Sequence, residues 1–293
     1  MDRILTASAA RGTVSLVAGI TSGLVREARE RHDLAPTASA AVGRLLTAAA
    51  LLGASLNGRE RLTLQLVGDG PIGSITADAW STGTHAIGAR AYARNGHADV
   101  PLNARGKFDV AGAVGSGKLQ VTKTYEVGQP YSSIVPLASG EIGDDVAAYL
   151  LNSEQIPSVV ALGVLADPGG IRAAGGVIAQ VMPGADDATI AALERNAASM
   201  PPITTQIADG AGTEALLRAV AGDLEIKLFD TYEIAFDCRC TREKVETALL
   251  GLGKDELAKI AREQPRTEAT CDFCGETYVL TADDVRGLAE RLG

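Results

Sequence analysis

The four cysteines of the chain form two close pairs near its C-terminus. Cys238-Arg-Cys240 is followed, after thirty residues, by Cys271-Asp-Phe-Cys274. Two thiolates one or two residues apart can bind the same ion, and two such pairs supply the four soft ligands of a tetrahedral zinc site. The three histidines all lie before residue 98, far from these pairs in the sequence. The residue types and their spacing therefore predict an all-thiolate zinc site.

The same closeness allows redox chemistry, because each pair can be oxidised to a disulfide once the metal leaves. A purely structural zinc knuckle stays open on spacing alone, although a CxC pair leaves less backbone than CxxC for the usual knuckle turn. A segment of about 60 residues is marginally stable by itself, whereas a structural zinc contributes roughly 10–16 kcal/mol of apparent binding free energy. We therefore expect zinc loss to unfold residues 232–293 and to leave the first 180 residues folded.

Two glycine-rich segments have the letters of phosphate-binding loops but not their context. GDGPIG (Gly68 to Gly73) fits G-x-G-x-x-G, yet a strand-like stretch follows it where a dinucleotide site needs a helix. GAVGSGKL (Gly112 to Leu119) has leucine where a Walker A loop needs a serine or threonine for Mg²⁺. We interpret both segments as structural turns, and no catalytic constellation is recognisable elsewhere in the sequence.

Two other functions remain open from the residues. A thiol–disulfide oxidoreductase could use Cys271 and Cys274 as its redox pair, although no thioredoxin-like βαβ pattern precedes them. A structural zinc ribbon could serve as a binding module. The formal net charge of −9 makes nucleic acid an unfavourable partner for such a module, because phosphate backbones are repelled.

Composition indicates an ordinary globular protein. Apolar residues make up 46% of the 293 residues, enough for a sizeable core. The longest apolar run, Leu45 to Leu56, is too short to cross a bilayer, and the first residues do not read as a signal peptide. We expect a cytoplasmic protein without a membrane partner. Thiols are normally reduced in that compartment, where four clustered cysteines indicate a metal or redox site rather than a disulfide framework.

The elements that must position the cysteines divide the chain into three predicted parts. Residues 1–183 predict a mixed α/β domain with large, mostly antiparallel sheets, because short alternating runs are separated by turn residues. Residues 184–231 predict a helical linker that extends to about Asp230. Residues 232–293 predict a small C-terminal zinc domain with two short helices between the cysteine pairs, then a strand and a final helix capped by Thr281. The predicted fold class is α+β.

The cysteine arrangement resembles that of the heat shock protein 33 family of redox-regulated molecular chaperones. The resemblance extends along much of the chain in a series of short segments whose order and spacing are specific. These are Pro36, Gly43-Arg44, Leu62-Thr-Leu-Gln65, Gly68-Asp-Gly-Pro71, Gly140-Glu-Ile142, Ser153-Glu-Gln155, Pro157-Ser158, Gly163-Val164, Ala174-Gly-Gly176 and Met182-Pro-Gly-Ala185.

The resemblance implies an ATP-independent holdase that is nearly inactive while it is reduced and bound to one Zn²⁺ ion. Oxidative stress, especially with heat, would join Cys238 to Cys240 and Cys271 to Cys274, release the zinc, and unfold the C-terminal region with its linker. The oxidised form would be a homodimer that captures unfolding client proteins. It would pass them to ATP-dependent chaperones when reducing conditions return.

Overall fold

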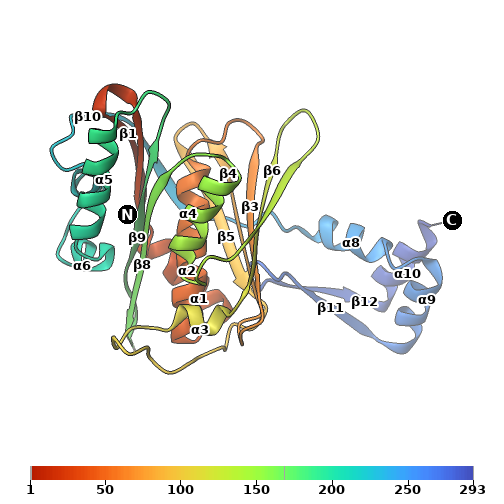
Figure 1. The fold of residues 1–293 in the computed structure, drawn as a ribbon. Helices are drawn as coiled ribbons and strands as arrows, with labels where there is room; N and C mark the ends of the chain where they lie inside the picture. The colour runs from red at the N-terminus through yellow and green to blue at the C-terminus, as the bar shows by residue number, and fades with distance from the viewer. Residues whose placement is uncertain (1, 168, 293) are drawn as a thin grey trace. The chain divides into compact units, whose positions relative to one another are not determined.

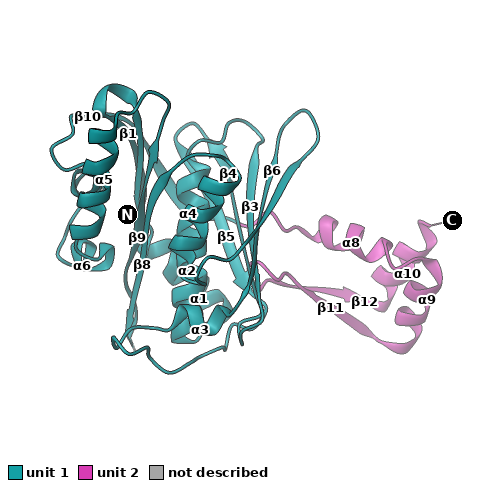
Figure 2. Cartoon of the chain, in the orientation of Figure 1, with its two compact units in different colours: residues 1–237 teal, residues 238–293 magenta. Residues whose placement is uncertain are grey.

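The computed structural model describes residues 2–167 and 169–292, and these form two compact units. Residues 1–237 make up the first unit and residues 238–293 the second (Figure 2). The predicted division into residues 1–183, 184–231 and 232–293 remains a prediction. None of the helices in the described residues is long and apolar enough to span a membrane.

A ten-stranded sheet forms the centre of the first unit (Figure 1). Its spatial order is β7-β6-β3-β4-β5-β10-β1-β2-β9-β8. Neighbouring described strands pair antiparallel, apart from β10 with β5, which are parallel. This confirms the predicted α+β class with a mostly antiparallel sheet. The strands are β1 (Arg3–Ala9), β2 (Val14–Ile20), β3 (Arg61–Gly68), β4 (Ser74–Gly83), β5 (Ala86–Ala93), β6 (Gly117–Thr124), β7 (Tyr131–Pro136), β8 (Ser158–Asp167), β9 (Gly170–Val181) and β10 (Ile226–Phe236).

Helices cover both faces of this sheet and enclose two apolar cores. On one face lie α1 (Ser22–His32), α2 (Pro36–Gly53), α3 (Val110–Val114) and α4 (Ile142–Asn152), which share the larger core. On the other face, over β1, β2 and β9, lie α5 (Asp187–Ser199), α6 (Ile203–Ala208) and α7 (Thr213–Ala221) with the second core.

Helix α2 is the central helix of the larger core. Proline stands at its first position, where the missing N–H costs nothing, and alanine and leucine fill most of the rest. Gly43 lies where α2 crosses α1 and β8. A Cβ atom at Gly43 would come within 2.6 Å of Val25 and 2.9 Å of Val164, so the close approach requires glycine.

The second unit has its own small core. It contains α8 (Arg242–Leu250), α9 (Lys254–Glu263), the antiparallel hairpin of β11 (Arg266–Thr270) and β12 (Thr277–Thr281), and α10 (Ala282–Glu290). Leu257, Leu280 and Val285 are among its buried apolar residues. The predicted cap of the last helix is present, since Thr281 and Asp284 form a reciprocal capping box.

One predicted element is wrong. The helical linker was expected to continue to about Asp230, but Ile226 to Phe236 forms strand β10 in the middle of the sheet. The register of β10 on β1 shifts between Leu5 and Ala7. Such a bulge reverses which side of the sheet the alternate residues face, so the period-two pattern of a strand is interrupted in the sequence.

Candidate metal centre

The two cysteine pairs lie in segments of different local structure. Cys238 and Cys240 lie on the irregular segment between β10 and α8. Cys271 and Cys274 lie in the turn between β11 and β12, where the amides of Cys274 and Gly275 both donate to the carbonyl of Cys271. Gly275 has φ of +74°, a left-handed conformation that glycine adopts without strain. This turn directs both of its thiols to the same side.

The four sulfur atoms gather at one point, and all lie within 4.8 Å of one another. The Sγ atoms of Cys238 and Cys271 are 3.8 Å apart, and those of Cys240 and Cys274 are 3.4 Å apart. Four sulfurs bound at about 2.3 Å to one tetrahedral ion lie about 3.8 Å from each other. The cluster therefore has the size and the ligand type of a four-thiolate zinc site, and none of the four sulfurs is in a disulfide.

The environment of the sulfurs explains why a cation would be needed to keep them charged. Burial raises the pKa of the Cys271 thiol and of the Cys274 thiol. Tyr278 on β12 donates a hydrogen bond from its hydroxyl to Sγ of Cys240 at 3.1 Å, and this bond raises the pKa of Tyr278. A donor to a ligand sulfur orients it and tunes its charge. Sequence reasoning missed Tyr278, because nothing in the sequence pairs it with a cysteine 38 residues earlier.

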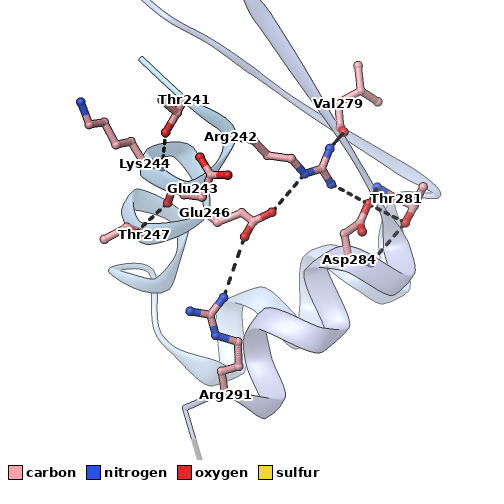
Figure 3. Close-up of polar contacts among 10 residues, drawn as sticks. All are labelled: Thr241, Arg242, Glu243, Lys244, Glu246, Thr247, Val279, Thr281, Asp284 and Arg291. Atoms are coloured by element: carbon pink, nitrogen blue, oxygen red, sulfur yellow. Dashed lines mark hydrogen bonds and ion pairs between the residues drawn. The ribbon is translucent and has the colours of Figure 1, made fainter. Parts of the chain in front are cut away.

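Arg242 connects three elements of the second unit (Figure 3). It follows Cys240 by two residues and opens α8. Its guanidinium donates to the carbonyl of Val279 on β12 at 3.0 Å and pairs with Asp284 of α10 at 3.0 Å. It also pairs with Glu246 on its own helix at 3.1 Å. The segment that carries the first cysteine pair is thereby tied to the hairpin and the helix that follow the second pair.

The setting of Cys271 and Cys274 differs from that of a dithiol oxidoreductase. In such enzymes a helix N-terminus or a nearby cation lowers the pKa of one cysteine. Here the pair lies in a hairpin turn, and the pKa values of both thiols are raised.

Gly68 to Gly73 is a structural turn, as predicted, whereas Gly112 to Leu119 runs from the end of α3 through a short bend into β6. They pack against each other: a Cβ atom on Gly68 would lie 2.0 Å from the carbonyl oxygen of Val114. The carboxylate of Asp69 accepts a hydrogen bond from the amide of Ser116 at 2.7 Å. The Ser116 amide, which a phosphate bound at the second segment would need as a donor, thus already donates to an acidic side chain.

Comparison with known proteins gives matches along the whole chain. The protein family described as "Hsp33 protein" matches residues 2–281. The "33 kDa chaperonin" of Bacillus subtilis is 42% identical over 293 residues, which cover 99% of each chain. The protein of the same name from Bacillus licheniformis is 42% identical over 294 residues, which cover 100% of each chain. The crystal structure of the 33 kDa chaperonin (heat shock protein 33 homolog) from Thermotoga maritima superposes with a TM-score of 0.90 at 35% identity, over 99% of this chain and 98% of that one.

Proposed function

The chain belongs to the Hsp33 family of 33 kDa chaperonins, and from this premise we propose an ATP-independent holdase that is switched by the oxidation of its four cysteines. The observation that carries the proposal is the convergence of four thiols from two distant segments within 4.8 Å of one another. Such a cluster binds a soft cation while it is reduced and loses its ligands when it is oxidised.

In the reduced state the second unit would hold one zinc ion. Zn²⁺, when bound, would keep all four sulfurs as thiolates and add its binding free energy to the stability of a unit with a small core. The Tyr278 hydroxyl orients Cys240, and Arg242 holds α8 against β12 and α10. These contacts keep the sulfurs together and the protein in its inactive form.

Oxidation would then pair sequence neighbours, Cys238 with Cys240 and Cys271 with Cys274. For each pair, two thiolates give up two electrons and form one S–S bond. One hydrogen peroxide molecule accepts these electrons, takes up two protons and becomes two waters. In the folded unit sulfurs also approach each other across the pairs, Cys238 to Cys271 at 3.8 Å and Cys240 to Cys274 at 3.4 Å. Neighbour pairing is nevertheless favoured once the unit loosens, since only sequence neighbours stay close in an unfolded segment.

The active form would bind unfolding proteins in the cytoplasm as a homodimer and release them to ATP-dependent chaperones when the disulfides are reduced. Membership in a chaperone family supports unfolded proteins as partners. The dimer, the hand-off and the compartment rest on the family resemblance.

The test is to treat the zinc-loaded protein with peroxide and to follow light scattering of a heat-denaturing client. Zinc content and free thiols are counted on the same sample. We expect about one zinc released and four thiols lost per chain, together with suppression of aggregation that the reduced protein lacks. Equal suppression by the reduced and oxidised forms would contradict the proposal.

A ligand variant tests the four-cysteine assignment. Cys271→Ser should weaken zinc binding and loosen the C-terminal unit even under reducing conditions, because three thiolates remain. Asp272→Asn, which changes the neighbouring residue and keeps all four thiols, is the control. An unchanged zinc affinity in Cys271→Ser would show that this sulfur is not a ligand.

A further inference from the structure

Strand β10 is the strand that joins the two halves of the ten-stranded sheet. On one side lie β7, β6, β3, β4 and β5, and on the other lie β1, β2, β9 and β8. Strand β10 pairs in parallel with β5 and antiparallel with β1. Among the described strands no other pairing connects the two halves. Removal of β10 would therefore leave two facing strand edges with unpaired backbone groups.

The burial of β10 is unusual for a central strand. Of its eleven residues, Ile234 alone is buried, whereas most residues of the adjacent β5 are buried. Its parallel pairing with β5 is limited to the four positions from Glu233 to Phe236. Segments with few buried apolar contacts open at lower free energy than the rest of a protein. Because it has fewer buried residues, β10 should be easier to displace from the sheet than the adjacent β5.

The C-terminal end of β10 is fastened at the residue just before the first cysteine. The amide of Asp237 donates to the carbonyl of Ala89 at 3.1 Å, and the indole N–H of Trp80 donates to the Asp237 carboxylate at 3.2 Å. Cys238 follows directly in the chain. While Cys238 is held in a folded metal cluster, we expect fraying of the strand from this end to be restricted. Once the cluster is lost, the end of the strand is held by its four-residue pairing with β5 and by the two hydrogen bonds of Asp237.

We propose that loss of the metal-bound state frees β10. An extended apolar segment of an unfolding client protein then takes the place of β10 between β5 and β1, a position that we call the slot. This inference rests on the proposed holdase function. The present occupant shows what the slot accepts: an extended backbone with apolar side chains at alternate positions, here Tyr232, Ile234 and Phe236, which pack on the larger core. Strand addition depends mainly on backbone hydrogen bonds, so it tolerates many sequences, as a holdase requires.

The slot would persist after β10 has left. Helix α2 packs on β4 and β5 in one half of the sheet and on β8 and β9 in the other. Its residues belong to the larger core, which includes Leu64 and Ile75 on one side and Ile178 on the other. The two halves are thus held in place by a helix that does not depend on β10.

The direct test uses a labelled synthetic peptide with the sequence of residues 226–236 and the full-length protein. By fluorescence anisotropy, we expect the peptide to bind the oxidised, zinc-free protein and not the reduced, zinc-loaded one. A peptide with proline in place of Glu233 cannot donate the hydrogen bond that the Glu233 amide makes to the carbonyl of His85, and it should bind about tenfold more weakly. Hydrogen exchange should show that the bound peptide protects amides of β1 and β5, while the outer strand β7 is unaffected.

Hydrogen exchange in the absence of peptide supplies the second test. Residues 226–236 should exchange rapidly after oxidation, while β3 and β4 remain protected. In the zinc-loaded protein, Trp80→Phe removes the bond to Asp237 and should speed exchange at β10, whereas Leu228→Ala, at a partly exposed position of the same strand, should not. If β10 stays protected in oxidised protein that does suppress aggregation, the proposal fails and the holdase function stands.

Two other outcomes separate this proposal from its alternatives. If the peptide binds the slot but the oxidised protein does not suppress aggregation, strand replacement is supported and the holdase function is wrong. If the oxidised protein is a dimer that excludes the peptide and protects both its own β10 and β1, the strand of a second copy fills the slot. That result would overturn replacement by a client segment.

Discussion

The hydroxyl of Tyr278 is the side-chain group outside the four cysteines that most directly affects the sulfur cluster. Its hydrogen bond to Cys240 stabilises negative charge on that sulfur. The cysteines themselves could be found from the sequence, because a pair two or three positions apart is a local signal. Tyr278 could not, since its contact depends on the β11–β12 hairpin bringing a tyrosine on β12 back to a segment 38 residues earlier.

Replacement of Tyr278 by phenylalanine should therefore weaken zinc binding while all four ligands are retained. Loss of a hydrogen bond to a metal ligand commonly lowers affinity by about 10–100-fold. Competition with a chromophoric chelator under reducing conditions measures the change. Tyr131→Phe, at an exposed tyrosine of the first unit, is the control. Equal affinities in Tyr278→Phe and Tyr131→Phe would show that the hydroxyl does not act on the metal site.

At the scale of elements, the sequence was most informative where the pattern is local. The final helix and its cap at Thr281 could be predicted because the signal lies within a few residues. Strand β10 could not be. Its alternation is broken by the bulge near Asp230, and ten of its eleven residues are not fully buried. What makes it a strand is pairing with β1 and β5, which are more than 130 residues away in the sequence.

Arg242 gives a prediction for the elements of the second unit. Arg242→Gln removes the ion pair that connects α8 to α10 through Asp284 and weakens the contact with the Val279 carbonyl. Thermal unfolding of the zinc-loaded C-terminal unit should occur a few degrees lower, because a network across three elements is lost. Arg286 pairs with Asp283 on its own helix, so Arg286→Gln is the matched control and should shift the midpoint little.

Replacing glycine by alanine should change the stability of the protein in opposite directions at two helix positions, one at the crossing of α2 with α1 and β8 and one in α4. Gly43→Ala would force a Cβ atom within 2.6 Å of Val25, and overpacking of this kind costs about 1–3 kcal/mol of unfolding free energy. Gly143→Ala in α4 meets nothing closer than 3.4 Å, and it should be neutral or stabilising by up to about 1 kcal/mol. Urea denaturation of the two variants measures both effects, and equal stabilities would contradict the packing argument.

At the scale of the whole molecule, the chain combines a large unit with two apolar cores and a small unit with one. We expect the large unit to have enough buried apolar surface to stay folded by itself, and the small unit to depend on its metal cluster. An oxidant that acts on four sulfurs should then unfold the small unit and leave most of the large unit folded.

Removal of zinc with a chelator, while a reductant keeps the thiols free, tests this separation without oxidation. Hydrogen exchange should become rapid in residues 238–293, while β3 and β4 keep their protection. Restoring zinc should restore protection in the same sample. A single cooperative loss of protection across both units would show that the large unit also depends on the metal.

The position of β10 also affects how the protein is made. Strand β5 ends at Ala93, yet its neighbour β10 begins only at Ile226. At about 5–20 residues per second, a ribosome needs roughly 7–27 s to synthesise the residues between them. During that time a newly made chain has strands β5 and β1 without the strand that separates them. The strand that joins the two halves of the sheet is thus the last of its ten strands to be translated, and it comes just before the first cysteine.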